Sequence, residues 1–171
     1  FYLSRILVAR PGSTHGYDVV DATRINPELG GEAGLRQLHQ RLHAQGMGIV
    51  VDIVPNHMAV GHHNAWWQDV LRWGRHSRHA EWFDIHWDSP DPALNGKVLL
   101  PFLGQPYAEA LEAGELVLRF DADHGELQIA HHDNVFPLTP TDYAAVLETA
   151  GSPRLKDCLL YTSDAADEGL G

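Results

Sequence analysis

A run of apolar residues interrupted by one acid constrains the fold of this chain more than any other feature. Residues 48–54 read Gly-Ile-Val-Val-Asp-Ile-Val, and Pro55 ends the run. A short β-branched run of this kind is typical of a strand that is covered on both faces, as in a parallel sheet. Asp52 lies inside the run, where a lone carboxylate is costly, so we expect it to pair with an arginine of a neighbouring strand.

The residues before this run predict the rest of a strand–helix–strand unit. Leu35, Leu38 and Leu42 recur at helical spacing and predict a helix over residues 32–45, which Gly46 ends. A short apolar stretch near the start, residues 2–8, predicts a strand end. Two later segments that contain Pro and Gly, residues 10–16 and 26–31, predict loops. The order strand, loop, helix, strand indicates a βαβ unit of a parallel sheet.

The pattern becomes mixed beyond residue 58. Residues 64–74 predict a helix with Trp66, Val70 and Trp73 on one face, a spacing that favours core packing over a platform for sugars. Two later runs predict the strands of a β-hairpin, and Pro137 closes that region. These runs are residues 115–120 and 126–132, joined by residues 121–125.

Charge and cysteine content narrow the classes of partner. The formal net charge is −11 over 171 residues, which argues against a nucleic-acid partner. No apolar run approaches the ~20 residues of a membrane span. The single cysteine, Cys158, cannot form an internal disulfide and fits a reducing compartment, so we expect a cytoplasmic protein. The first residues do not have the pattern of a signal peptide, and we expect that the sequence begins inside a strand of a larger domain. Residues 156–171 resemble the translation of a sequencing adapter, so we expect them to be a non-native tail.

Polar side chains follow two of the predicted strands. Asn56 and His57 come directly after Pro55, and the sequence His15-Gly16-Tyr17 follows the first strand. The carboxyl ends of parallel strands meet at one edge, so both groups are expected to face one pocket. An imidazole can donate to a substrate hydroxyl, and a pyranose can stack on the Tyr17 ring. The chain has twelve His but no spacing typical of zinc sites, so we expect no metal and no cofactor.

These segments resemble the α-amylase family of glycoside hydrolases. Residues 52–57, Asp-Ile-Val-Pro-Asn-His, are similar to the first signature segment of that family, and His15-Gly16-Tyr17 is similar to its tyrosine segment. Within the family, longer stretches resemble the maltooligosyltrehalose synthases. They are residues 2–4 with 9–19, residues 24–31, and residues 83–85 with 96–101. The resemblance covers residues 1–155, and Arg5 departs from it where a proline is expected.

The resemblance implies an α/β fold cut from a larger domain. Residues 1–57 would be a fragment of a (β/α)₈ TIM barrel, about strands 2–3 with the intervening helix, and residues 58–155 an inserted α+β subdomain after strand 3. In the family, Tyr17 would stack the sugar at the cleavage subsite, with His15 beside it, and His57 would bind the primary hydroxyl of that sugar. Asp52 would hold an arginine of the fourth strand, and Asn56 would shape the loop into the insertion.

The implied activity is an intramolecular transglycosylation of maltooligosaccharides. The α-1,4 bond at the reducing end is broken, a glycosyl-enzyme forms, and the freed glucose attacks through its anomeric hydroxyl to give an α,α-1,1 bond. Retention needs two carboxyl groups about 5 Å apart. In the family the nucleophile, the general acid and a third, supporting carboxylate follow the fourth, fifth and seventh strands, so we expect no catalytic residue within this chain. A glucan hydrolase of the α-amylase type and a non-catalytic glucan-binding module remain alternatives.

Overall fold

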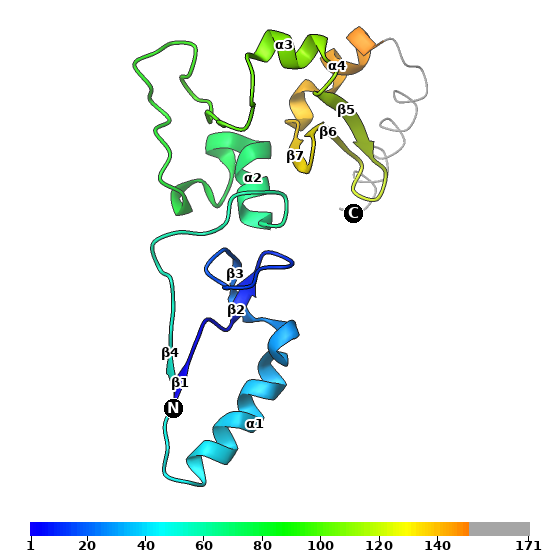
Figure 1. Ribbon diagram of the computed structural model, residues 1–171. Coiled ribbons are helices and arrows are strands. Elements are labelled where there is room, and N and C mark those ends of the chain that lie inside the picture. The colour runs from blue at the N-terminus through cyan, green and yellow to red at the C-terminus, as the bar shows by residue number, and fades with distance from the viewer. Residues whose placement is uncertain (151–171) are drawn as a thin grey trace, which may run out of the picture. The chain divides into compact units, whose positions relative to one another are not determined.

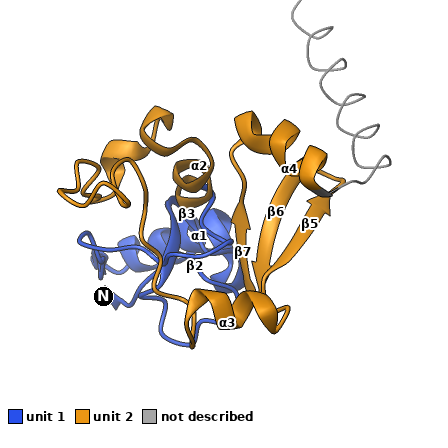
Figure 2. Ribbon diagram, turned by 90° about the horizontal axis from the view of Figure 1, so that it is seen from above, with its two compact units in different colours: residues 1–65 blue, residues 66–171 orange. Residues whose placement is uncertain are grey.

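The computed structural model of the chain describes residues 1–150, which divide into two compact units between Ala65 and Trp66 (Figure 2). The predicted domain boundary after residue 57 stays a prediction. The predicted non-native tail, residues 156–171, lies outside the described residues.

Short strands and helices alternate along the described chain (Figure 1). The strands are β1 (Tyr2–Leu3), β2 (Leu7–Ala9), β3 (Val19–Ile25), β4 (Val50–Val51), β5 (Val117–Asp121), β6 (Glu126–His131) and β7 (Asn134–Pro137). The α-helices are α1 (Gly31–His43), α2 (Ala65–Trp73), α3 (Tyr107–Glu112) and α4 (Tyr143–Ala150). Single 3₁₀ turns occupy Pro27–Leu29, Gly74–His76, Ala80–Trp82 and Pro140–Asp142.

The first unit contains the predicted strand–helix–strand order. Strand β1 pairs with β4 in parallel, with Tyr2 opposite Val50, and helix α1 lies between the two strands in sequence. The backbone N–H of Asp52 donates to the carbonyl of Leu3 at 2.9 Å and extends this pairing by one residue. The parallel pairing and the intervening helix confirm an α/β arrangement in residues 1–65.

Helix α1 begins and ends close to the predicted residues. Leu42 is buried, as its place in the leucine repeat predicts. At the far end, Gly46 has a φ of 73°, and Met47 N–H donates to the Leu42 carbonyl at 3.0 Å. Gly46 N–H donates to His43 at 2.9 Å, which completes a Schellman motif. Glycine is favoured at this position because a side chain there would strain the left-handed backbone.

Two features of the first unit differ from the sequence-based expectation. The apolar run 48–54 is not covered on both faces, because Val50 is 62% and Ile53 60% exposed. Among residues 1–150, β4 pairs with β1 alone. The two-stranded sheet is therefore too small to bury the side chains of β4 on both faces. Strand β3 was not predicted from the sequence. This strand is defined by its antiparallel pairing with β2, and that pairing is irregular because it has register shifts on both sides of Val8.

The second unit contains the predicted hairpin within a larger sheet. Strands β5 and β6 pair antiparallel from Val117 opposite Ala130 to Asp121 opposite Glu126, which confirms the hairpin. Strand β7 extends the sheet to the order β5-β6-β7 and was not predicted. Pro137 ends β7, where a proline is tolerated because this strand lies at the edge of the sheet.

Helix α2 provides the other half of the core of the second unit. Trp67 and Val70 are buried, and Leu127 of β6 is fully buried. Trp73 is 42% exposed, so the prediction that it packs in the core is wrong. The buried stripe runs through Trp67 and Val70, three residues apart, and the Trp67 ring lies 5.0 Å from the ring of Phe83.

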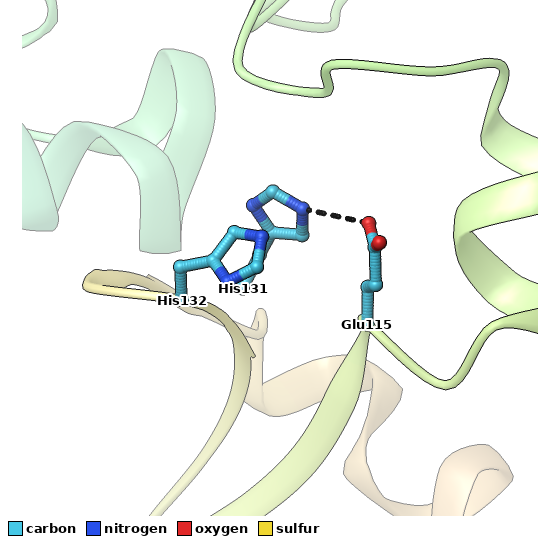
Figure 3. Close-up of side chains that lie close together, drawn as sticks. All are labelled: Glu115, His131 and His132. Carbon is cyan, nitrogen blue, oxygen red and sulfur yellow. Dashed lines mark hydrogen bonds and ion pairs between the residues drawn. The ribbon is translucent and has the colours of Figure 1, made fainter.

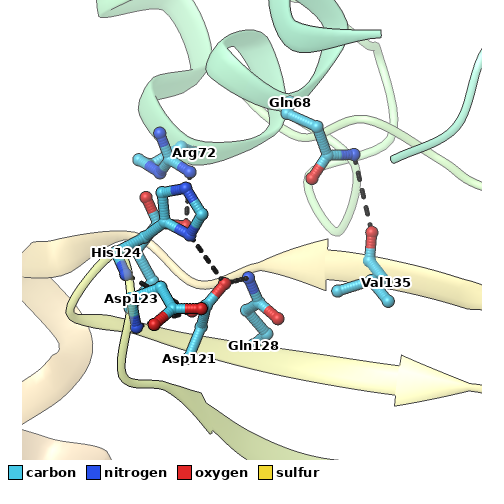
Figure 4. Close-up of polar contacts among 8 residues, drawn as sticks. Gln68, Arg72, Asp121, Asp123, His124, Gln128 and Val135 are labelled. Atoms are coloured by element: carbon cyan, nitrogen blue, oxygen red, sulfur yellow. Dashed lines mark hydrogen bonds and ion pairs between the residues drawn. The ribbon is translucent and has the colours of Figure 1, made fainter. Parts of the chain in front are cut away.

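Polar contacts tie α2 to the sheet, as Figure 4 shows. Arg72 forms an ion pair with Glu126 of β6 at 2.6 Å, and both side chains are mostly buried. The Thr139 hydroxyl donates to the backbone carbonyl of Arg72 at 2.9 Å. Each of these bonds joins residues more than fifty positions apart, so the helix and the sheet fold as one unit.

Among residues 1–150, no helix is long and apolar enough to cross a membrane.

Candidate functional site

The loop between β2 and β3 is held by its own polar groups. The backbone N–H of Arg10 donates to the Asp18 carbonyl at 2.9 Å and closes the loop at its base. The Ser13 hydroxyl donates to the Asp18 carboxylate and accepts from the backbone N–H of Gly16 at 3.0 Å. Gly16 has a φ of 71°, which a residue with a side chain adopts only with strain. The loop therefore presents residues 15–17 in a fixed conformation.

Asp18 is the electrostatic centre of this loop. Partial burial opposes its ionisation, but the Ser13 hydrogen bond and the interactions with His15 and Arg10 outweigh it and lower the pKa of the carboxyl below its ordinary value. The Arg10 Nε lies 3.5 Å from the carboxylate, and the His15 Nδ1 lies 3.7 Å away. Asp18 is thus ionised at neutral pH and anchors the residues on both sides of Tyr17.

Tyr17 is exposed at the tip of the loop and is covered on one face by Arg5. The Arg5 guanidinium carbon lies 3.4 Å from the Tyr17 ring centroid, a close cation–π contact. The His15 ring lies 5.9 Å from the Tyr17 ring, and its Nδ1 accepts the Tyr17 backbone N–H at 3.0 Å. A Cβ on Gly16 would meet Arg5 Cβ at 3.3 Å, so a glycine permits this close approach. The sequence marked Arg5 as unusual but did not predict that it stacks on Tyr17.

Asp52 faces a tyrosine rather than an arginine within the described chain. Loss of hydration and a hydrogen bond to the Asp52 carboxylate raise the pKa of the Tyr2 hydroxyl above its ordinary value, while Arg5 lowers it. Asp52 is half-buried and forms no ion pair among residues 1–150. The predicted arginine partner of Asp52 stays a prediction.

A backbone hydrogen bond links the chain just after residues 52–57 to the chain just after residues 15–17. The N–H of Ala59 donates to the Val19 carbonyl at 2.8 Å. Because Ala59 is two residues after His57 and Val19 is two residues after Tyr17, this bond ties the two segments together just beyond their polar side chains. Asn56 and His57 are exposed and make no hydrogen bond or ring contact within residues 1–150. The structure brings the segments together but not the side chains of His57 and Tyr17.

A pocket of about 460 Å³ in the first unit includes Arg5, His15 and Gly16 but neither Tyr17 nor His57. Its other walls include Leu35 and Leu38 of α1, the apolar face of that helix. This cavity is therefore a gap between the helix and the strands, and the exposed face of Tyr17 is the better candidate for a sugar site.

A cluster in the second unit was missed by the sequence pattern. Glu115, His131 and His132 each offer a ligand atom, and these atoms all lie within 4.8 Å of one another. His131 is 4% exposed, so it is a buried histidine. The pairing of β5 with β6 brings Glu115 close, and adjacent histidines alone do not reveal this.

Comparisons with known proteins agree on one family for these segments. The family model described as alpha amylase, catalytic domain, matches residues 1–113. A Mycobacterium tuberculosis protein described as maltooligosyl trehalose synthase is 54% identical over 105 residues, which are 60% of this chain and 13% of that protein. The intracellular maltogenic amylase of Bacillus subtilis is 41% identical over 85 residues, 50% of this chain and 14% of that protein.

A solved structure is similar to a larger share of the chain. The crystal structure of a maltooligosyl trehalose synthase has a TM-score of 0.72 and 42% identity, and covers 81% of this chain and 18% of the other. The chain thus spans less than a fifth of the length of these relatives.

Proposed function

The chain belongs to the α-amylase family, and from this premise we propose that it is part of a maltooligosyltrehalose synthase. The observation that carries the proposal is the pair of neighbouring polar segments, 15–17 and 52–57, in a βαβ unit that matches the catalytic-domain model of the family. The subfamily follows from the 54% identity to a relative of that name. The complete protein would be an isomerase that acts on maltooligosaccharides in trehalose synthesis.

The proposed roles of this chain are to bind and orient the glucan. Tyr17 would stack on a pyranose face, because its ring is 42% exposed and its backbone is fixed by His15. His57 would donate to the primary hydroxyl of the same sugar, since its imidazole is exposed and free of other hydrogen bonds within residues 1–150. Asp52 and Asn56 would shape the pocket between these two side chains.

The chemistry of bond exchange would be carried by carboxylates elsewhere in the complete protein. A retaining mechanism uses one carboxylate as nucleophile and a second carboxyl group as the acid, about 5 Å apart. The products differ from those of a hydrolase because the freed glucose, rather than water, attacks the glycosyl-enzyme. We propose that residues 58–155, as an inserted subdomain, help to exclude water from that intermediate.

The activity is tested by incubating the complete gene product with maltopentaose. A non-reducing product of unchanged length that ends in a trehalose unit would support the proposal. Glucose and maltose alone would instead establish an amylase-type hydrolase, the alternative that the 41% identity to a maltogenic amylase favours. Binding without turnover would indicate a glucan-binding module.

The residue roles are tested by substitution in the same complete protein. Tyr17→Ala should lower kcat/KM by about 2–12-fold, because stacking on one aromatic ring contributes about 0.5–1.5 kcal/mol. Tyr107→Ala is the matched control, since Tyr107 is 64% exposed in the second unit. If the two substitutions lowered kcat/KM equally, the proposed role of Tyr17 in binding the glucan would be wrong.

A further inference from the structure

Three potential metal ligands lie close together at the open end of the β5–β6 hairpin, the end opposite its turn. Glu115 precedes β5, His131 ends β6, and His132 begins the turn into β7. The Nε2 of His131 lies 3.4 Å from the nearest carboxylate oxygen of Glu115. Figure 3 shows the two imidazoles and the carboxylate turned toward one another.

The backbone at His132 makes this convergence possible. Successive side chains of a regular strand point to opposite faces, so His131 and His132 would ordinarily lie apart. His132 instead has a φ of 50°, because β6 and β7 are joined by a two-residue turn with His131 opposite Asn134. This left-handed conformation brings the two imidazole centroids to 4.3 Å. The antiparallel register, continued two residues beyond β5, also places Glu115 opposite His132.

His131 provides a second and independent sign of a ligand. Its side chain is buried beneath Phe102, whose ring centroid lies 5.2 Å away. Its Nδ1 has no hydrogen-bond partner, and its Nε2 contacts Glu115 alone among residues 1–150. A neutral imidazole carries one donor and one acceptor nitrogen, so every tautomer leaves one buried nitrogen unsatisfied. A cation bound at Nε2 would replace this contact to Glu115, and Nδ1 would then carry the imidazole proton.

The distance between His131 Nε2 and the Glu115 carboxylate matches two ligands of one tetrahedral ion better than a hydrogen bond. A separation of 3.4 Å is long for a nitrogen–oxygen hydrogen bond. Two ligands bound to one zinc ion at about 2.0–2.1 Å lie about 3.3–3.4 Å apart. We propose that Glu115, His131 and His132 form a binding site for a divalent zinc-type cation. Two imidazoles and one carboxylate are a ligand set that suits zinc better than calcium or magnesium.

The site leaves a fourth position open beside the protein. Gly104 and Gln105 line the same pocket as the three ligands, and a water molecule completes the tetrahedron there. The ion joins the start of β5 to the β6–β7 turn, so it stabilises the folded sheet by its binding free energy.

Zinc titration by calorimetry tests the site on the full 171-residue chain without an affinity tag. The chain carries Cys158→Ser, so that its one thiol supplies no ligand. We expect one saturable zinc site per chain. His132→Asn removes the imidazole but suits a left-handed backbone, and Glu115→Gln keeps a hydrogen-bonding group without the charge. Each should weaken zinc binding by at least about tenfold, since even loss of an outer-sphere partner costs 10–100-fold.

His86→Ala is the matched control, because His86 is an exposed histidine of the same unit. It should leave the zinc affinity unchanged, and far-ultraviolet circular dichroism should show that all variants keep the fold of the parent chain. Absence of a saturable site, or zinc affinities of the Glu115 and His132 variants equal to that of the parent, would overturn the proposal.

Discussion

The stacking of Arg5 on Tyr17 predicts that Arg5→Ala increases the catalytic efficiency of the complete protein. The guanidinium lies 3.4 Å from the ring centroid, which is the distance that a stacked sugar would need, so the two compete for this face. A cation–π contact at a partly exposed site contributes about 0.5–1 kcal/mol. Since 1.4 kcal/mol corresponds to a factor of ten, removing Arg5 should raise kcat/KM by about 2–5-fold.

Initial rates with maltopentaose well below KM measure this effect directly. Arg36→Ala is the control, because Arg36 lies on the exposed side of α1 in an ion pair with Glu32 and should leave kcat/KM unchanged. A lower kcat/KM in Arg5→Ala would refute the reasoning, since it would mean that the guanidinium binds the glucan rather than excludes it. An unchanged value would place the sugar on the other face of Tyr17.

Further predictions concern stability, ionisation and the activity of the chain alone. Asp69→Ala should lower the free energy of unfolding by about 2–5 kcal/mol in urea melts, because the buried Ser77 and His79 both bond its carboxylate and each orphaned group costs about 1–3 kcal/mol. The Ser77 and His79 hydrogen bonds outweigh burial and lower the Asp69 pKa, so this stability is present at neutral pH and should be lost as pH falls below the ordinary aspartate value. The Asp121 hydrogen bond raises the His124 pKa, so its NMR titration should shift to lower pH in Asp121→Asn. The chain alone should not convert maltopentaose, and detectable product would show that it holds the catalytic carboxylates.

The elements that the sequence predicted are those whose signal is local. Helix α1 follows from leucines three and four residues apart, and its end follows from the glycine at 46. The β5–β6 hairpin follows from two runs separated by a short polar turn. In each case the residues that form the hydrogen bonds are close in sequence, so the pattern contains most of the information.

The elements that the sequence missed depend on partners that are distant or irregular. Strand β3 is half exposed and polar after Val20, and the pairing with β2 that defines it has register shifts. Strand β7 ends in a proline, which argues against a strand unless its place at the sheet edge is known. In the site, Tyr17 and His57 were predicted from motifs, whereas the Arg5 stack depends on the path of the β1–β2 loop.

Backbone bonds position Tyr17 independently of the contacts that its ring makes with Arg5 and His15, and this helps to separate a role in binding from a role in folding. The loop closes through Arg10 and Asp18, and the strand that follows is bonded to Ala59. None of these bonds uses the phenol ring, which is 42% exposed. Truncating the ring removes the Arg5 contact, which contributes about 0.5–1 kcal/mol, so a loss of activity in Tyr17→Ala with a free energy of unfolding in urea that changes by no more than this would identify contact with the substrate. A parallel loss of stability would instead assign the ring to the fold.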